Sequence, residues 1–325
     1  MKRINYVKRT KMLSQSRNSD FFLLAQQMIA RMQGECRPKT VYNCQTALRA
    51  LRRYLLAEHS FMNGRLPLRC LTPDLVADFC RHLARRGVTD NTVREYLRSL
   101  RSLVNRCIKC RMPLRADLFS LVSTSPVSTA RVSLSECDLR RICAAQVKPG
   151  GKDERTRDLA VFSYLAGGIP FADLARLKTA NYDADTHSLT YRRHKTGIAV
   201  RVHLTAEARR IWLRHGKNGG SPYHFGLIGS TVQEMAEKEC ANALAAYNRS
   251  LRCLTARCGV GKRVTSYTLR HTFATVARHT YGAPLDLLSL PLGHRSERTT
   301  ALYVDRPTHD MLQRLQCKME RNLMK

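Results

Sequence analysis

Four side chains in the C-terminal part of the sequence have types and spacings suited to phosphate chemistry. Arg270 and Tyr267 lie three residues apart, His294 follows a glycine, and Tyr303 comes nine residues after that histidine. Cleaving a phosphodiester without water requires a nucleophile, cations for the charge that develops on the phosphoryl oxygens, and an acid for the leaving oxygen. A guanidinium donates two parallel hydrogen bonds to phosphate oxygens. The order of residues therefore predicts phosphate chemistry with Tyr303 as the nucleophile.

These motifs resemble the C-terminal signature of the tyrosine site-specific recombinases, the phage integrase family. The matching stretches are Leu-Arg270-His271-Thr-Phe-Ala, Leu-Gly-His294 and Thr-x-x-Tyr303. The resemblance implies a 3′-phosphotyrosyl DNA intermediate and a free 5′-hydroxyl, with Arg270 and His294 binding the scissile phosphate. His271 would point elsewhere and have a structural role. Because the covalent bond conserves the phosphodiester energy, neither ATP nor a metal ion is implied, and we expect no cofactor.

Lys195 lies between two segments, 188–193 and 199–204, that predict a β-hairpin with Thr-Gly197 at its tip. The hairpin resembles the one that carries the family's catalytic lysine, which implies that Lys195 donates a proton to the leaving 5′-oxygen. A solvated turn lysine without a catalytic role is the alternative.

One departure from the family pattern removes a cation. The family has a further arginine in Gly-x-Arg at the start of a helix, and this chain has Pro170 in that place. Losing one preorganised donor of this kind typically costs roughly 10²–10³ in rate. We expect Arg193 to substitute, because positions two apart on a strand face the same side and Arg193 lies two residues before Lys195. Arg192 would face away, and Arg176 is the second choice.

The other departure is Tyr267, where the family usually has histidine three residues before the arginine. A phenol can donate a hydrogen bond to phosphate, but it does not easily shuttle protons near neutral pH because phenols have a pKa of about 10. We therefore expect Lys195 or water to act as the general acid or base. A branch of the family associated with bacterial mobile elements and DNA inversion shows similar departures, which favours an enzyme.

The composition independently indicates a polyanionic partner. The 325 residues include 56 Lys and Arg against 25 Asp and Glu, which gives a formal net charge of +31. Lysines and arginines that neutralise phosphates release counterions, so binding should be strongly sensitive to salt. Charge alone does not separate DNA from RNA or from an anionic membrane. The order of the motifs favours double-stranded DNA.

The N-terminal part has the apolar spacing of four helices in a small bundle, over residues 20–123. This segment resembles the family's core-binding, SAM-like domain. The polar face of its last helix carries four cations that we expect along a DNA backbone, with a merely solvated face as the alternative: Arg94, Arg98, Arg101 and Lys109. Residues 1–19 hold six basic residues and no acidic one, and are either an extra DNA-binding arm or a basic tail.

A linker rich in Ser, Thr and Pro is predicted over residues 124–132, followed by a catalytic domain over 133–325. Ser133 and Glu136 have the spacing of a helical capping box. The fold class is therefore mainly α with a small β-hairpin or sheet, α+β. An amphipathic stretch with Met311, Leu315 and Met319 predicts a terminal helix, which in this family packs on a neighbouring protomer. The alternative is a helix that folds back on its own domain.

Neither a membrane nor a metal partner is expected. No apolar run approaches the roughly 18–20 residues that span a bilayer, and there is no apolar signal core, so we expect a cytoplasmic, nucleoid-associated bacterial protein. The 12 cysteines are scattered, which favours reduced thiols. Cys107 and Cys110 could form half of a zinc site, but no second pair of ligands follows at finger spacing.

Taken together, the sequence predicts a recombinase of the integrase or invertase type. By resemblance it would act as a homotetramer on paired DNA sites, exchange strands through a Holliday junction, and use accessory DNA-bending proteins. The alternative is a catalytically impaired relative that binds specific DNA sites. A basic RNA-binding protein would explain the charge but not Arg270, His294 and Tyr303 together. The target site, and integration as against excision or inversion, cannot be deduced from the sequence.

Overall fold

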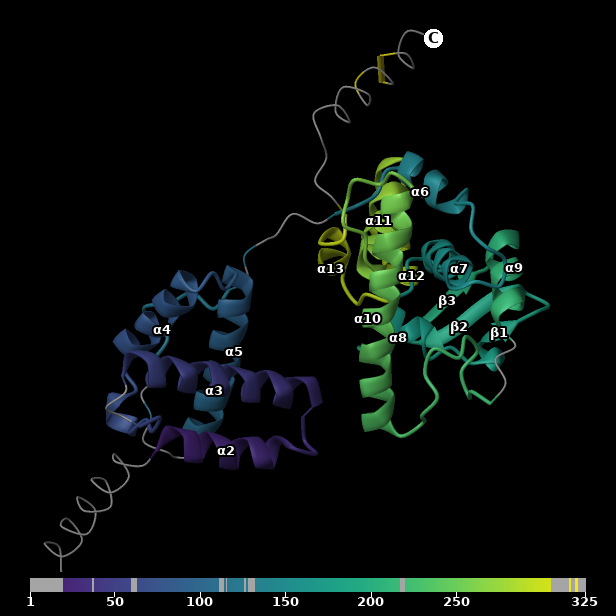
Figure 1. Cartoon of the computed structure of the whole chain (residues 1–325). Helices are drawn as coiled ribbons and strands as arrows, with labels where there is room; N and C mark the ends of the chain where they lie inside the picture. Colours follow the sequence, from purple (N-terminus) through teal and green to yellow (C-terminus); the bar gives the residue numbers. More distant parts are fainter. Residues whose placement is uncertain are drawn as a thin grey trace, which may run out of the picture. The chain divides into compact units, whose positions relative to one another are not determined.

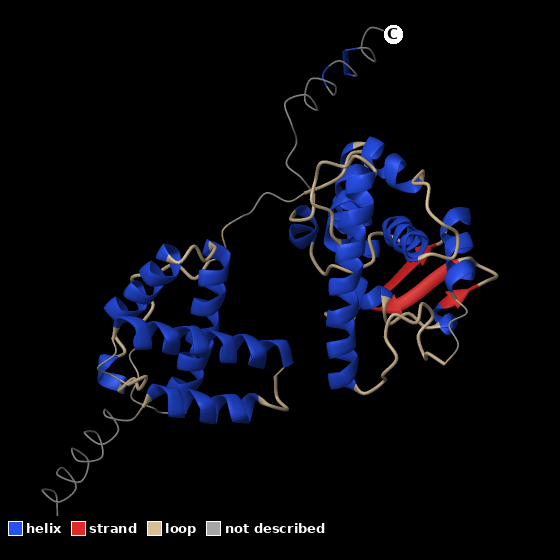
Figure 2. Cartoon of the chain, viewed as in Figure 1, coloured by secondary structure: helices blue, strands red, loops and turns tan. Residues whose placement is uncertain are grey.

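The structure is a computed structural model that describes residues 20–36, 38–59, 63–110, 114, 116–125, 127, 132–216, 220–304, 316 and 319–320. The chain divides into two compact units, Met1–Thr129 and Ala130–Lys325. Most of the described residues are helical, and the strands all belong to the second unit (Figures 1 and 2). This confirms the predicted fold class, mainly α with a small sheet.

The described residues of the first unit form four helices and a short 3-10 turn: α2 (Phe21–Met32), α3 (Pro38–Glu58), η2 (Leu68–Cys70), α4 (Pro73–Arg85) and α5 (Asp90–Lys109). Helix α5 packs against α2, α3 and α4. Large side chains from all four helices are almost fully buried between them, including Phe21, Leu51, Phe79 and Leu103.

Two helices of this unit, α2 and α4, begin at residues whose side chains replace missing backbone partners. Asp20 accepts hydrogen bonds from the backbone N–H groups of Phe22 and Leu66, both at 3.0 Å, so it caps α2 and also holds the loop before η2. Thr72 caps α4 through the N–H of Leu75, with Pro73 in the first turn.

The second unit surrounds helix α7. Its elements are α6 (Glu136–Cys143), α7 (Lys152–Leu165), α8 (Phe171–Leu174), η3 (Thr179–Asn181), β1 (Tyr182–Asp183), β2 (Ser188–Arg192), β3 (Ala199–His203), α9 (Ala206–His215), α10 (Gln233–Arg257), α11 (Ser266–His279), α12 (Leu285–Leu292) and α13 (Glu297–Ala301). Helix α7 packs against α6, α9, α10 and α11 (Figure 1). Its apolar side chains therefore meet neighbours on several sides, and Phe162 contacts both Trp212 and Phe225.

The strands form an antiparallel sheet in the order β1-β2-β3, with Ser188 opposite His203 and Arg192 opposite Ala199. The predicted hairpin is thus confirmed. Helix α12 lies against β3, which brings the end of α12 close to the hairpin tip. The predicted capping box at Ser133 is wrong: α6 is capped by Ser135, which pairs with Asp138. Both boxes pair a serine with an acidic residue three positions later, and the later one begins the helix.

The predicted basic arm and the terminal helix fall on residues outside the described part, apart from a few positions such as the exposed Met319. None of the described helices is long and apolar enough to cross a membrane.

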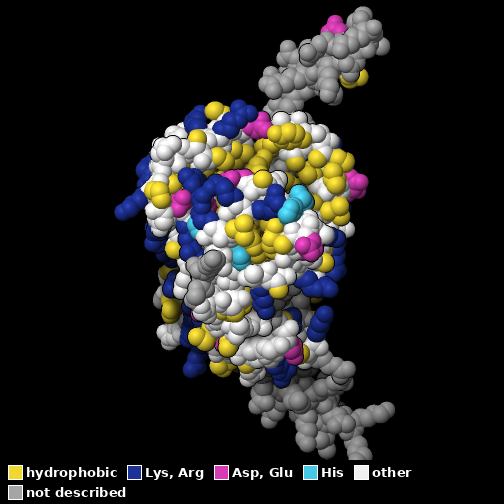
Figure 3. Space-filling model, turned by 90° about the vertical axis from the view of Figure 1, so that its right-hand side faces the viewer, with side chains coloured by type: hydrophobic (Ala, Val, Ile, Leu, Met, Phe, Trp, Pro, Cys, Tyr) yellow, Lys and Arg dark blue, Asp and Glu magenta, His cyan; other side chains and the backbone are white. Residues whose placement is uncertain are grey.

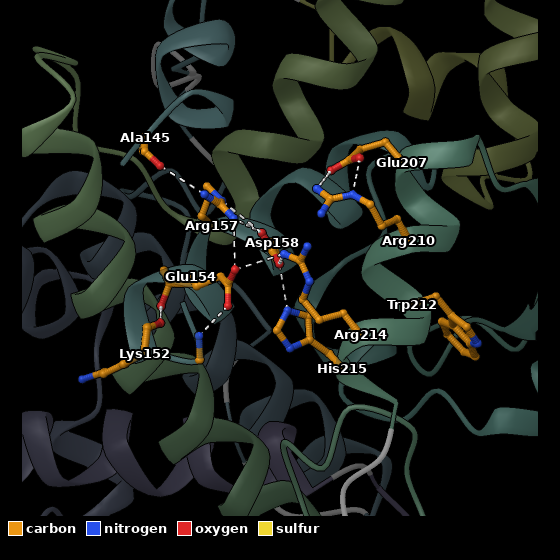
Figure 4. Close-up of polar contacts among 12 residues, drawn as sticks. Ala145, Lys152, Glu154, Arg157, Asp158, Glu207, Arg210, Trp212, Arg214 and His215 are labelled. Carbon is orange, nitrogen blue, oxygen red and sulfur yellow. Dashed lines mark hydrogen bonds and ion pairs between the residues drawn. The ribbon is translucent and has the colours of Figure 1, made fainter. Parts of the chain in front are cut away.

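A buried ionic cluster joins α7 to α9 (Figure 4). Asp158 is buried and accepts hydrogen bonds from Arg157 at 2.9 Å, Arg214 at 2.8 Å and His215 at 2.9 Å. Glu154 also accepts from Arg214, at 3.1 Å. Burial alone would raise the pKa of the Asp158 carboxyl, but the hydrogen bonds from His215 and Arg157 outweigh it and hold the pKa at about 2.

Replacing Asp158 by Asn is expected to destabilise the second unit by roughly 3 kcal/mol, because it removes the buried carboxylate that accepts hydrogen bonds from Arg157, Arg214 and His215. The depressed pKa means that the carboxylate stabilises the fold above about pH 4 and that this contribution, about 2 kcal/mol, is lost as the pH falls towards 2. Fluorescence of Trp212, the sole tryptophan, reports unfolding of this unit next to the cluster. Asp185→Asn, at an exposed turn, is the control, and equal losses in the two variants would contradict the prediction.

Candidate active site

Helix α11 carries Tyr267, Arg270 and His271 on one face, because positions i, i+3 and i+4 of a helix lie together. The helix begins at Thr265, whose hydroxyl accepts from the N–H of Thr268. Tyr267 stands in the first turn and is 49% exposed, whereas Arg270, one turn further, is fully buried. The helix thus extends from the surface at Tyr267 into the interior at Arg270.

The Arg270 guanidinium is held by backbone carbonyls from two other segments. Its Nη1 donates to Gly168 O at 2.9 Å, and its Nη2 donates to Leu292 O and to His294 Nε2, the latter at 3.1 Å. Burial and the nearby charge of Arg193 lower the pKa of Arg270. An arginine nevertheless stays protonated in proteins, so the site contains a fixed positive charge. Its Nε is buried and has no hydrogen-bond partner among the described residues.

Two glycines allow this close packing. Gly168 has a φ of +70°, and a Cβ there would lie 3.1 Å from Arg270 Cα. Gly293 has a φ of +59° and ends α12 in a left-handed cap, and a Cβ there would lie 2.8 Å from Arg193 Cγ and 2.9 Å from Val200 Cγ2. Both positions thus require a residue without a side chain.

Arg193 reaches the same carbonyl as Arg270. It is buried, its Nη1 donates to Leu292 O, and its Nε lies 2.7 Å from Asp173 Oδ2. The other Asp173 oxygen accepts the backbone N–H of His194 at 2.7 Å, which ties the hairpin turn to α8. The structure therefore brings the guanidinium of Arg193 beside that of Arg270, with one buried carboxylate to balance them.

The two other arginines considered for the missing donor lie elsewhere. Arg192 is exposed and donates to Gly197 O at 3.2 Å, on the opposite side of the strand. Arg176 donates to Ala172 O at 2.9 Å and lies 3.6 Å from Glu237. Among these three arginines, only Arg193 shares a hydrogen-bond acceptor with Arg270.

His294 is fixed in one tautomer by its partners. Since Arg270 can only donate, His294 Nε2 must accept, and the proton therefore lies on Nδ1, which donates to Thr300 Oγ1 at 3.0 Å. Thr300 in turn lies 2.6 Å from Ser289 Oγ, and that hydroxyl donates to Leu285 O. Burial, reinforced by the charges of Arg270 and Arg193, lowers the pKa of His294 to about 4. The imidazole is therefore neutral at pH 7.

Tyr303 is half-buried among these groups. Its ring centroid lies 5.0 Å from Arg270 Cζ, 4.7 Å from the His294 ring and 4.9 Å from the His271 ring. Its phenol oxygen is hydrogen-bonded to that of Tyr267. Burial would raise the pKa of the Tyr303 phenol, but the hydrogen bond from Tyr267 and the charge of Arg270 together outweigh it, so the pKa lies below its ordinary value.

Lys195 is exposed at the tip of the hairpin, and its charge also favours the Tyr303 phenolate. The prediction that His271 points elsewhere is wrong. His271 is buried against Tyr303, with its ring stacked on the Tyr303 ring and its Nδ1 lying 3.3 Å from the Tyr303 backbone oxygen. Tyr303 lies over the face that Tyr267 and His271 share, four residues apart on α11.

Two parts of the site were not predicted from the sequence. Asp173 follows Pro170 by three residues, and its only signal is a carboxylate in an otherwise apolar segment, where burial would demand a cation. The Thr300 hydroxyl that orients His294 belongs to the Thr-x-x-Tyr303 stretch, but the sequence indicated no role for it. No described residues form a cluster of three or more His, Cys, Asp or Glu suited to holding a metal ion.

The four cations predicted to contact DNA lie along α5 of the first unit. Arg98, Arg101 and Lys109 line a surface pocket of about 480 Å³ together with Arg106. Arg98 is paired with Glu95 on its own helix, and Arg101 donates to Thr124 Oγ1 at 3.2 Å.

The remaining cation of this set, Arg94, donates to Ser123 Oγ at 2.6 Å and to Ser125 O at 2.7 Å. Two of the four arginine and lysine side chains thus hold the segment that follows the bundle. On the face drawn in Figure 3, Lys and Arg side chains are spread widely and acidic side chains are few.

Comparison with known proteins agrees with this arrangement. Residues 20–114 match the family model of the phage integrase SAM-like domain. No curated protein sequence matches the chain. Among solved structures, lambda integrase bound as a dimer to a COC′ core site is similar over 90% of this chain and 97% of its own, with a TM-score of 0.69 and 14% identity. The Tn1549 transposon integrase in complex with a circular intermediate DNA is similar over 92% and 98%, with a TM-score of 0.63 and 18% identity.

The chain therefore contains a phage integrase SAM-like domain and has the fold of a tyrosine recombinase. The resemblance first drawn from Arg270, His294 and Tyr303 is confirmed at the level of the fold.

Replacing Gly293 by Ala tests whether the turn after α12 sets the position of Arg193. The new Cβ would collide with Arg193 and Val200, which we expect to destabilise the second unit by about 1–3 kcal/mol beyond the cost of the left-handed backbone. Gly282→Ala is the matched control, because Gly282 has a φ of +69° and open space at its Cβ. Unfolding followed by Trp212 fluorescence should separate the two variants, and equal losses would show that the collision is harmless.

Proposed function

We propose that this protein is a site-specific DNA recombinase that cuts and rejoins DNA through a phosphotyrosyl intermediate. The observation that carries the proposal is the convergence of a half-buried tyrosine with two buried guanidiniums, a neutral histidine and an exposed lysine in one chain. These groups supply a nucleophile, charge stabilisation and an acid, which are the three requirements of phosphodiester transfer. The recombinase fold supports the same reading.

In the proposed reaction the Tyr303 oxygen attacks the scissile phosphorus while the bond to the 5′-oxygen breaks. Arg270 and Arg193 stabilise the negative charge on the other phosphoryl oxygens. The buried Nε–H of Arg270, without an acceptor among the described residues, is a donor that a phosphate oxygen can satisfy. Lys195, exposed at the hairpin tip, protonates the leaving oxygen.

His294 acts here as a hydrogen-bonding group, because its depressed pKa leaves it neutral at pH 7. A phosphate that takes over the Arg270 hydrogen bond would free His294 Nε2, and the added negative charge would raise the pKa of the imidazole. His294 could then donate to the phosphate through Nε2. The hydroxyl of Thr300 keeps the ring oriented during this change.

Arg193 takes the role of the arginine that Pro170 replaces. The proposal is supported by its Nη1 on Leu292 O, the acceptor that Arg270 also uses, and by the ion pair with Asp173 that holds it there. With Arg193 and Arg270 on one phosphate, the site keeps two guanidinium donors although the position at the start of α8 carries no charge.

The first unit is proposed to hold DNA through α5, where Arg98, Arg101 and Lys109 share a basic pocket. Contacts of this kind position a duplex without reading its sequence. With a net charge of +31, binding is expected to weaken steeply with salt.

The assembly is proposed from chemistry and from similar structures. One similar structure, with a TM-score of 0.67, is a lambda integrase tetramer bound to a Holliday junction. We propose the same assembly here, a homotetramer on paired sites in the cytoplasm that exchanges strands in integration, excision or inversion of a mobile element. Accessory DNA-bending proteins would assist it.

Covalent trapping tests the proposed function. The protein is incubated with nicked suicide duplexes built from inverted repeats that flank its own coding sequence, and DNA–protein adducts are sought on denaturing gels. We expect an adduct with the native protein and none with Tyr303→Phe, while both bind the duplex equally. Binding without any adduct would instead identify a DNA-binding relative that does not cleave.

A mixing experiment extends this test, because Tyr303 lies against Arg270 of its own chain. Tyr303→Phe protein mixed with Arg270→Ala protein should form no adduct, since neither chain then contains a complete site. Restored cleavage would show that the tyrosine acts on a phosphate held by another protomer.

Arg193→Ala is expected to slow adduct formation by roughly 10²–10³ with little loss of DNA affinity. Arg192→Ala is the matched control, because it removes the neighbouring guanidinium on the exposed side of the strand and should change the rate only a few-fold. Arg193→Lys retains a cation opposite Asp173, so it separates catalysis from folding, which Trp212 fluorescence monitors. Equal rates of adduct formation for the native protein and Arg193→Lys would mean that Arg193 contributes only a positive charge opposite Asp173.

A further inference from the structure

Tyr267 contacts the proposed nucleophile itself. The phenol oxygens of Tyr267 and Tyr303 are hydrogen-bonded, and the two ring centroids lie 5.8 Å apart at an interplanar angle of 50°. The two side chains are therefore in contact through their rings, which are tilted to each other, and through their hydroxyl groups. From the sequence, Tyr267 was predicted to be able to donate a hydrogen bond to the phosphate, whereas in the structure its hydroxyl contacts the Tyr303 oxygen, the atom that would attack.

The position of Tyr267 on α11 suits this contact. Tyr267 and His271 lie four residues apart on the helix, and Tyr303 lies across both side chains. His271 is buried and stacks on the Tyr303 ring, whereas Tyr267 is 49% exposed and reaches the phenol oxygen from the solvent side. One residue thus holds the ring and the other contacts the reacting atom.

We infer that Tyr267 donates a hydrogen bond to the Tyr303 oxygen as Tyr303 loses its own proton. Tyr267 thereby activates the nucleophile. The inference rests on the proposed function, because it concerns the same reaction. A hydrogen bond to a charged acceptor is stronger than one to a neutral acceptor. The Tyr267 hydroxyl therefore favours the phenolate over the phenol.

The other charged or titratable groups around Tyr303 perform different tasks. From α11, Arg270 supplies positive charge 5.0 Å from the ring, and His271 lies 3.3 Å from the backbone oxygen. From the turn after α12, His294 lies against the ring and is bonded to Arg270 and Thr300. From the hairpin, Lys195 adds a further charge. A phenolate would thus receive positive charge from two elements and a hydrogen bond from Tyr267.

The proton balance is simple. The Tyr303 oxygen forms a bond to phosphorus, the bond between phosphorus and the 5′-oxygen breaks, and Lys195 gives a proton to that oxygen. The Tyr303 proton passes to water at the exposed edge beside Tyr267. Tyr267 keeps its own proton throughout, so the hydrogen bond is released when the phosphotyrosyl bond forms and is restored when the strands are rejoined.

The first test uses the free protein without DNA. Ultraviolet absorbance of phenolate is recorded against pH for the native protein and for Tyr303→Phe, and the difference gives the titration of Tyr303. The same pair is then measured in a Tyr267→Phe background. We expect the Tyr303 midpoint to rise by about one pH unit or more when the Tyr267 hydroxyl is removed. An unchanged midpoint would overturn the inference and leave the proposed function intact.

Tyr281→Phe is the matched control. Tyr281 is 73% exposed in the same unit, and its hydroxyl donates to Glu136 at 3.0 Å instead of to Tyr303. Removing it should leave the Tyr303 midpoint where it is. A shift of the same size in Tyr281→Phe would show that the titration reports a general change in the unit.

The second test follows cleavage of a duplex with sulfur in place of the bridging 5′-oxygen. A thiolate leaves without protonation because thiols are far more acidic than alcohols, so the rate depends on the nucleophile and no longer on Lys195. Tyr267→Phe should reduce adduct formation about tenfold at neutral pH and move its pH profile upwards, approaching the native rate at high pH. A uniform loss at all pH values would mean that Tyr267 acts on the phosphate. The absence of adduct with the native protein would refute the proposed function itself.

Discussion

A single backbone carbonyl, that of Leu292, accepts hydrogen bonds from two buried guanidiniums, and the rest of the site depends on this junction. Two like charges so close together repel each other in a medium of low dielectric constant. The carboxylate of Asp173 balances one of them, and the Gly168 carbonyl satisfies part of the other. The arrangement is therefore stable only because α8, the hairpin, α11 and the end of α12 meet at one point.

The buried position of these cations is also what makes them useful. In water an arginine attracts phosphate weakly, because the solvent screens its charge, whereas a desolvated guanidinium that is already oriented requires little reorganisation when an anion arrives. The charges of Arg270 and Arg193 reinforce the effect of burial that keeps His294 neutral. The charge of Arg270, together with the hydrogen bond from Tyr267, shifts Tyr303 towards the phenolate against the opposing effect of its burial. The buried charge of Arg270 thus affects the protonation of two other side chains.

Much of the fold and site could be predicted from the sequence, since periodicity and spacing are local properties. The hairpin followed from two alternating segments around a turn, and Arg270, His294 and Tyr303 were identified by their order along the chain. Contacts between distant segments could not be deduced. Asp173 meets Arg193 only because α8 packs beside the hairpin, and His271 meets Tyr303 only because the chain after α13 returns across α11. The helix start at Ser135 was missed because two overlapping capping boxes compete in the sequence.

If Arg193 on the hairpin replaces the guanidinium missing at the start of α8, as proposed, there is a consequence for how the site is controlled. Arg193 and Lys195 now belong to one short turn, whose backbone is fastened to α8 by the bond between His194 N–H and Asp173. A displacement of this turn would move the proposed phosphate ligand, Arg193, and the proposed acid, Lys195, at the same time. Phosphate binding and protonation of the leaving oxygen would therefore be mechanically coupled. A mutation or a neighbouring molecule that shifts the turn would affect both steps together.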